Sequence, residues 1–173
     1  MDIYFEHLVK MRKDTKSFGM LALIWGVILA ILFLAVWLLW VYLPLCLIIV
    51  GFGIYSGVQL TKMLDGEYEY ILTNGEIDVD IIIGKSKRNR IITFNCADIE
   101  RIEKYNAKNP LCEREKFEKT GMYCNKDDIN AYSLVFKHKT LGSTCVTIDI
   151  PVKMQDKMLP FMNKLVAKDA FKN

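Results

Sequence analysis

Four cations gathered in one short stretch are the residues whose chemistry is easiest to name. They are Lys85, Lys87, Arg88 and Arg90. A basic turn near an anionic leaflet can bind lipid headgroups, and each cation there contributes about 1 kcal/mol. The alternative is a solvated hairpin tip in which Arg88 or Arg90 pairs across strands with Asp78 or Asp80. The pattern therefore predicts either a lipid or phosphate contact or a cross-strand ion-pair network.

No other group of residues has the spacing of a catalytic or metal site. The five cysteines form no C-x-x-C pair, and the only histidines are His7 and His138. We find no base beside a nucleophile and no phosphate loop. Glu76, Asp78 and Asp80 alternate with apolar residues, which is typical of the wet face of a strand. We expect no enzyme, no metal and no cofactor, and free, mostly buried thiols in a reducing compartment.

The stretch from Ser17 to Thr61 contains no Asp, Glu, Lys, Arg or His. One membrane crossing needs about 20 apolar residues, so this stretch is long enough for two. Pro44 favours the first turn of a second helix. We predict helices over about 19–38 and 41–62, with Trp37, Trp40 and Tyr42 near the turn at headgroup level. A cleaved signal peptide and a soluble core hairpin are both disfavoured, because the run is too long and has no polar stripe.

The cations flanking this apolar stretch predict its orientation. They precede the first helix and follow the second, and none lies in the turn: Lys10, Arg12, Lys13, Lys16 and Lys62. The positive-inside tendency then places both termini in the cytoplasm, for a multi-pass protein of the plasma membrane. Residues 1–16 read as a cytoplasmic, basic, amphipathic lead on the inner leaflet. The alternative is a frayed helical start whose cations only set the topology.

Small residues four positions apart predict how the two helices pack. Gly26 and Ala30 in the first helix and Gly53 and Gly57 in the second lie at similar depths of an antiparallel hairpin. We interpret them as the intramolecular packing face, and the alternative is a homodimer seam.

After Lys62 the pattern becomes alternating and predicts one cytoplasmic domain over residues 63–173. Asn74-Gly75 is a strong hairpin signal. The predicted elements are strands at about 67–73, 76–83, 88–95, 131–137 and 144–150, a mobile excursion at 106–130, and an amphipathic helix at about 153–168 with Pro160 inside it.

This order of elements resembles bacterial membrane proteins that carry a PH-like (pleckstrin-homology-like) domain. The supporting residues are Tyr70 to Ile77, which look like that group's Y-x-x-T-x-x-x-[IL] strand-turn-strand, then Gly84, Ile92 and residues 97–102. The N-terminal residues are similar to an uncharacterised Gram-positive family of this architecture. The resemblance implies an α+β membrane protein: a transmembrane helical hairpin followed by a curved antiparallel sheet or barrel capped by a C-terminal helix.

Two functions fit these expectations. The first is a membrane-anchored PH-like binding or adaptor module for a protein partner or anionic lipid. The second is a structural protein that self-assembles through its hairpin as a homo-oligomer. The net charge of +3 is too small to predict nucleic-acid binding.

Overall fold

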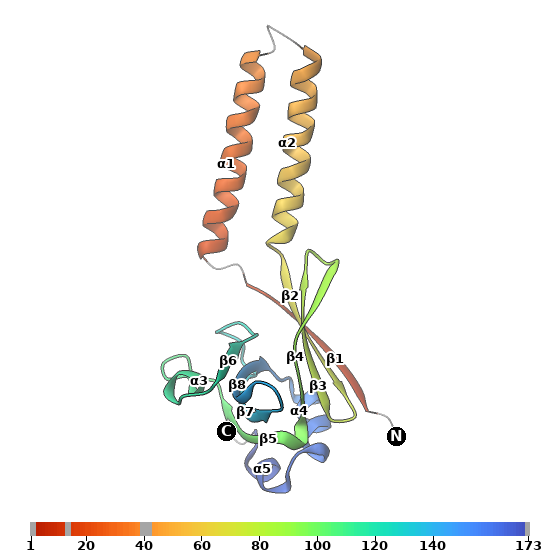
Figure 1. Cartoon of the computed structure of the whole chain (residues 1–173), viewed down its shortest axis with the longest axis vertical. Helices are drawn as coiled ribbons and strands as arrows, with labels where there is room; N and C mark the ends of the chain where they lie inside the picture. Colours follow the sequence, from red (N-terminus) through yellow and green to blue (C-terminus); the bar gives the residue numbers. More distant parts are fainter. Residues whose placement is uncertain (1–2, 13–14, 39–42, 172–173) are drawn as a thin grey trace. The chain divides into compact units, whose positions relative to one another are not determined.

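The N-terminal residues form a strand of the main sheet. The computed structural model describes residues 3–12, 15–38 and 43–171. In it β1 (Tyr4–Lys10) pairs antiparallel with β2 (Gly66–Thr73), and Lys10 lies opposite Glu67 (Figure 1). The prediction of a membrane-surface lead over residues 1–16 is therefore wrong for this strand. The apolar residues of β1 alternate as in a strand. The local pattern could not identify its partner, β2, because β2 follows the long apolar stretch.

Two long helices separate these paired strands, α1 (Thr15–Leu38) and α2 (Leu43–Met63). Both are long and apolar enough to cross a membrane. Their large side chains are mostly exposed, for example Phe33 at 79% and Phe52 at 71%. A soluble core hairpin would bury such side chains, so the helices suggest membrane association. Trp40 and Tyr42, predicted to mark the turn, lie outside the described residues.

Within residues 3–12, 15–38 and 43–171, the strands form two four-stranded sheets. The first has the order β1-β2-β3-β4, with β3 (Glu76–Ile83) and β4 (Lys87–Asn95) continuing the meander. A short 3₁₀ turn (Cys96–Asp98) leads into β5 (Ile99–Lys104) of the second sheet. That sheet has the order β5-β7-β8-β6, and its strands are β6 (Lys119–Met122), β7 (Ala131–His138) and β8 (Gly142–Asp149). β6 pairs parallel with β8, whereas β7 pairs antiparallel with both of its neighbours.

The excursion predicted at 106–130 contains regular secondary structure and a covalent link to β8. It contains the short helix α3 (Leu111–Arg114) and strand β6, and a disulfide joins Cys112 to Cys145 in β8. Leu111 and Cys145 pack in a small apolar cluster with Val135, apart from the main core. The expectation of free thiols is wrong for this pair. Its two cysteines are 33 residues apart, and only the fold brings their Cα atoms to 5.5 Å.

The C-terminal helix is broken where Pro160 stands. α4 (Val152–Met158) passes into a 3₁₀ turn (Leu159–Phe161), and α5 (Lys164–Asp169) starts afresh. Proline lacks an N–H and clashes with the preceding turn, so one helix over 153–168 could not form. The side chain of Asn163 accepts a hydrogen bond from the Leu165 N–H, which caps α5.

Both sheets and the C-terminal helices share one apolar core. Phe94 and Phe136 stack across it with ring centroids 4.3 Å apart. Met154 and Met158 of α4 are fully buried in the same cluster, so the methionines belong to the core. These elements form the α+β class that the sequence predicted.

The chain divides into two compact units. One contains Met1–Met11, Glu67–Ile82 and Arg88–Asn173, and the other contains Arg12–Gly66 and Ile83–Lys87. The second unit thus joins both long helices with the turn between β3 and β4. The four cations of the predicted basic cluster are divided between the two units: Lys85 and Lys87 belong to the second, and Arg88 and Arg90 to the first.

Candidate functional site

Arg88 and Arg90 are committed to ion pairs within the first sheet. Nη2 of Arg88 lies 2.5 Å from Oε1 of Glu69. Arg90 contacts two carboxylates, with Nη2 2.9 Å from Oδ2 of Asp78 and Nε 3.2 Å from Oδ1 of Asp80. The cross-strand alternative that the sequence allowed therefore describes Arg90. Both arginines lie in the unit that contains the sheets.

The carboxylates beneath these arginines are more buried than the sequence suggested. Asp80 is 2% exposed, so the expectation of a wet face is wrong for it, and Glu69 is 1% exposed. Oε2 of Glu69 has no hydrogen-bond partner among the described residues. Burial raises the pKa of Glu69, and the Arg88 guanidinium opposes that shift. Arginine stems can cover such groups while their charged ends stay in water. The alternation of Glu69 with Tyr68 and Tyr70 gave no sign of this burial.

Lys85 and Lys87 are placed quite differently from the arginines. Both are exposed, and within the described part of the chain neither makes an ion pair. Their turn belongs to the same compact unit as the helices. The Gly84 N–H donates to the carbonyl of Asp65, 2.9 Å away, just after the end of α2 (Figure 1). The predicted basic cluster therefore consists of two arginines in ion pairs and two lysines that have no ion pair in the part of the chain that the structure describes.

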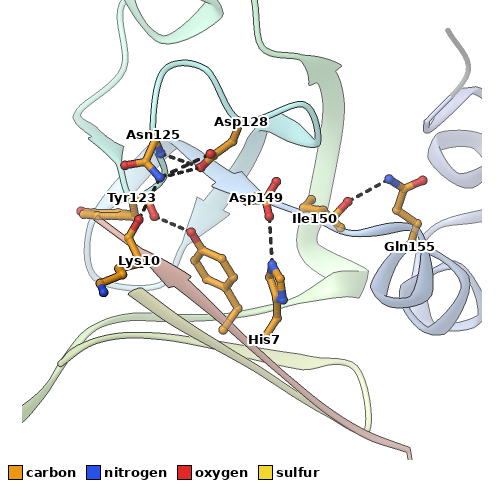
Figure 2. Close-up of polar contacts among 9 residues, drawn as sticks. His7, Lys10, Tyr123, Asn125, Asp128, Asp149, Ile150 and Gln155 are labelled. Atoms are coloured by element: carbon orange, nitrogen blue, oxygen red, sulfur yellow. Dashed lines mark hydrogen bonds and ion pairs between the residues drawn. The ribbon is translucent and has the colours of Figure 1, made fainter. Parts of the chain in front are cut away.

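A network of polar contacts fixes β1 to the second sheet. Figure 2 shows His7 with Nε2 2.9 Å from Oδ2 of Asp149, at the end of β8. The Asn125 side-chain amide donates to the carbonyl of Lys10 at 3.0 Å. At the first residues of β1, Lys157 of α4 donates to the carbonyl of Tyr4 at 2.9 Å and lies over the Phe5 ring. The strand that leads toward α1 is thus held by side chains from three later segments.

The residue types of this network invite a catalytic interpretation, because a His–Asp pair can orient a base. Cys124 lies between Tyr123, whose carbonyl accepts from the Tyr70 hydroxyl, and Asn125. Burial raises the pKa of the Cys124 thiol to about 12, so it stays protonated at neutral pH. The pair therefore has no activated thiol at Cys124, and its contacts are explained by holding β1.

The predicted helix-packing glycines behave differently on the two helices. Gly53 and Gly57 of α2 are buried, and a side chain at Gly57 would collide with Ile28 of α1. Gly26 and Ala30 of α1 are exposed, so their assignment to the intramolecular face is wrong. α1 instead presents Ile28 and Ala35, which are buried. Gly57 of α2 thus faces Ile28, a large side chain of α1, and matching small residues by depth could not predict this contact.

A shallow groove runs beside β5, an edge strand of the second sheet. Two adjoining hollows of about 540 and 270 Å³ share Glu100, Leu165 and Val166 in their lining. Leu165 of α5 is 79% exposed. The acidic residues Asp98 and Glu100 line the first hollow, and Lys137 is the cation there. Sequence reasoning missed this groove, because it depends on how α5 restarts after Pro160 and lies against β5.

Comparison with known proteins identifies the family. No curated protein and no solved structure matches the chain. A family model described as "Bacterial PH-like domain (DUF6106)" matches residues 1–168. The match runs through β1, both apolar helices and both sheets, which confirms the resemblance inferred from the sequence. The chain therefore belongs to the bacterial PH-like domain family DUF6106.

Proposed function

We propose that this protein is a non-catalytic adaptor, a PH-like module held at the membrane by α1 and α2 to bind a protein partner. The observation that carries this proposal is the pairing of β1 with β2. The two strands flank the apolar helices, so the domain is built from chain on both sides of the hairpin. The chain therefore connects the domain to the helices twice, from β1 to α1 and from α2 to β2, and not through a single linker.

The same pairing bears on membrane topology. Lys10 and Glu67 are neighbours in one sheet, so the chain between them must cross the membrane an even number of times. The basic residues flanking the helices favour the cytosolic side, and the disulfide favours an oxidising compartment. We place the domain on the cytosolic face of the plasma membrane. We give the basic residues more weight than the disulfide, because they act when the helices insert into the membrane, before the domain folds and brings Cys112 close to Cys145.

The groove beside β5 is the proposed partner surface. An edge strand offers backbone groups to an extended peptide, and neighbouring pockets take alternate side chains. Leu165 supplies an exposed apolar contact, while Asp98 and Glu100 outnumber the single cation of the first hollow. The occupant that fits this chemistry is an extended segment with basic and apolar residues.

A photocrosslinking amino acid in place of Leu165, in the full-length protein in its native membrane, tests this proposal. Ile129, which is 83% exposed, is the matched control position. We expect a protein adduct at position 165 only, mapped by mass spectrometry to a net basic segment, and its loss in the Glu100→Lys variant. An adduct that is equally strong at position 129, or one that Glu100→Lys leaves unchanged, would refute the groove.

One observation favours the second function, self-assembly through the hairpin. Gly26 and Ala30 form a small-residue pair that is exposed on α1, whereas Gly53 and Gly57 are buried and cannot form the seam. Gly26→Leu should then abolish oligomers seen by crosslinking in native membranes. Oligomers that survive this change, or a wild-type protein that is monomeric, would exclude assembly through this face.

A further inference from the structure

The turn between β3 and β4 is attached to the end of a membrane-length helix. α2 has 21 residues and spans about 30 Å at roughly 1.5 Å per residue, which matches a hydrocarbon core of about 30 Å. Lys62 is the basic residue of its last turn. A hydrogen bond joins Gly84 to Asp65, and a Cβ at Gly84 would lie 3.3 Å from the Lys62 carbonyl oxygen. If α2 spans the bilayer, this turn lies at headgroup depth.

The backbone of this turn is unusual at Lys85. In the first hairpin turn, Asn74 and Gly75 have φ of 49° and 89°, and both residue types suit this left-handed region. In the second turn Gly84 and Lys85 have φ of 60° and 58°. A lysine at positive φ is uncommon and costs conformational energy that asparagine or glycine would avoid. The turn therefore contains a lysine in a strained backbone conformation, and its ammonium group forms no ion pair with any described residue.

We propose that Lys85 and Lys87, together with Lys62, bind the phosphate groups of anionic phospholipids in the leaflet where α2 ends. The neighbouring Arg88 and Arg90 are excluded from this contact, because buried and partly buried carboxylates hold them. The lysines are exposed and unpaired among the described residues. This inference goes beyond the adaptor function: it requires only that α2 spans the bilayer and does not depend on the groove beside β5.

Energy transfer in nanodiscs of the full-length protein measures this contact. A fluorophore is attached to Ser86→Cys, and the acceptor is trace acyl-labelled phosphatidylglycerol or acyl-labelled phosphatidylcholine in a phosphatidylcholine bilayer. We expect transfer to favour phosphatidylglycerol several-fold, since one cation near an anionic surface gives about a fivefold preference. The preference should fall toward one in about 1 M NaCl, where the Debye length is about 3 Å.

The variant Lys85→Gly with Lys87→Gln separates lipid binding from folding. Glycine suits the positive φ at position 85, so this variant should melt no lower than the parent protein while losing the lipid preference. Lys139→Gln with Lys153→Gln removes the same charge from exposed lysines of the other unit and should keep the preference. Equal transfer to the two lipids in the parent, no transfer to either, or a preference that survives Lys85→Gly with Lys87→Gln would overturn the proposal. The crosslink at position 165 is unaffected by any of these results.

Discussion

Replacing Arg88 and replacing Glu69, its buried ion-pair partner, should change the stability of the protein in opposite directions. Glu69 is 1% exposed with one unpartnered oxygen, whereas the side chain of Arg88 is 52% exposed. Removing Arg88 leaves a buried carboxylate uncompensated, which costs about 3–5 kcal/mol for fully buried pairs. Because the side chain of Arg88 is half exposed, solvent screens this interaction and the loss should be smaller than for a fully buried pair. We therefore expect Arg88→Gln to lower the free energy of unfolding by roughly 2 kcal/mol.

Replacing Glu69 should have the reverse effect. Glu69→Gln relieves the burial of a half-satisfied charge, which costs about 3 kcal/mol or more, and gives up the same contact with Arg88, which is worth roughly 2 kcal/mol. Glu6, through a hydrogen bond and its charge, and Asp80, through its charge, also raise the pKa of Glu69, so a neutral side chain at this position removes that repulsion. We expect a gain of about 1 kcal/mol, or roughly 4 °C in Tm for a domain of this size. The double variant should recover most of what Arg88→Gln loses.

The pH dependence of this effect has a defined sign. Burial, more than any other cause, raises the pKa of Glu69 in the folded state. A carboxyl with a raised pKa binds protons more readily when folded, so its contribution to stability is lost as pH rises from the ordinary glutamate range through the folded value. The advantage of Glu69→Gln over the parent should therefore be largest at neutral pH and shrink on acidification.

Circular dichroism melting of the full-length protein in detergent, at a series of pH values, measures these differences. Glu67→Gln on the same strand is the control for a partly buried carboxylate, and it should change Tm little. The reasoning fails if Glu69→Gln lowers Tm as much as Arg88→Gln, because the pair would then be net stabilising. It also fails if the Tm difference between Glu69→Gln and the parent grows as pH falls.

Three further predictions concern the disulfide, the hairpin and the topology. Cys112→Ser with Cys145→Ser should cost about 3–4 kcal/mol, from a closed loop of 33 residues, and the parent should lose the same Tm on reduction; an unchanged Tm would contradict this. Gly57→Leu should disrupt helix pairing, seen as lost crosslinking between α1 and α2, whereas Gly26→Leu should not. Ile129→Cys should react with a membrane-impermeant maleimide only after cells are permeabilised, and labelling of intact cells would place the domain outside.

The elements that the sequence located well depend on neighbouring residues. The two apolar helices, the Asn74-Gly75 turn and the strands on either side of it follow from hydropathy and residue conformation over a few positions, although α1 starts at Thr15, four residues before the predicted start. Turn residues and alternation act locally, so pattern alone reveals them. The elements that were missed depend on partners far along the chain. The Ile3 N–H donates to the Asn74 side chain across 71 residues, and β6 pairs parallel with a later strand.

The candidate site divides in the same way. The four cations are visible in the sequence, but only the fold pairs Arg88 with a buried Glu69 and leaves Lys85 and Lys87 without an ion pair to any described residue. A charge pattern records where cations are along the chain and says nothing about which carboxylate approaches them. That choice depends on strand pairing, which joins segments that the apolar stretch separates.

By itself, the sequence determined that this chain has two helices of membrane length and a β-rich domain, because hydropathy and alternation are properties of consecutive residues. Only the tertiary structure decided that the domain begins before the helices, that Cys112 reaches Cys145, and that two of the four cations are structural. Each of these depends on contacts between residues distant along the chain, and such contacts are selected by the packing of the whole fold.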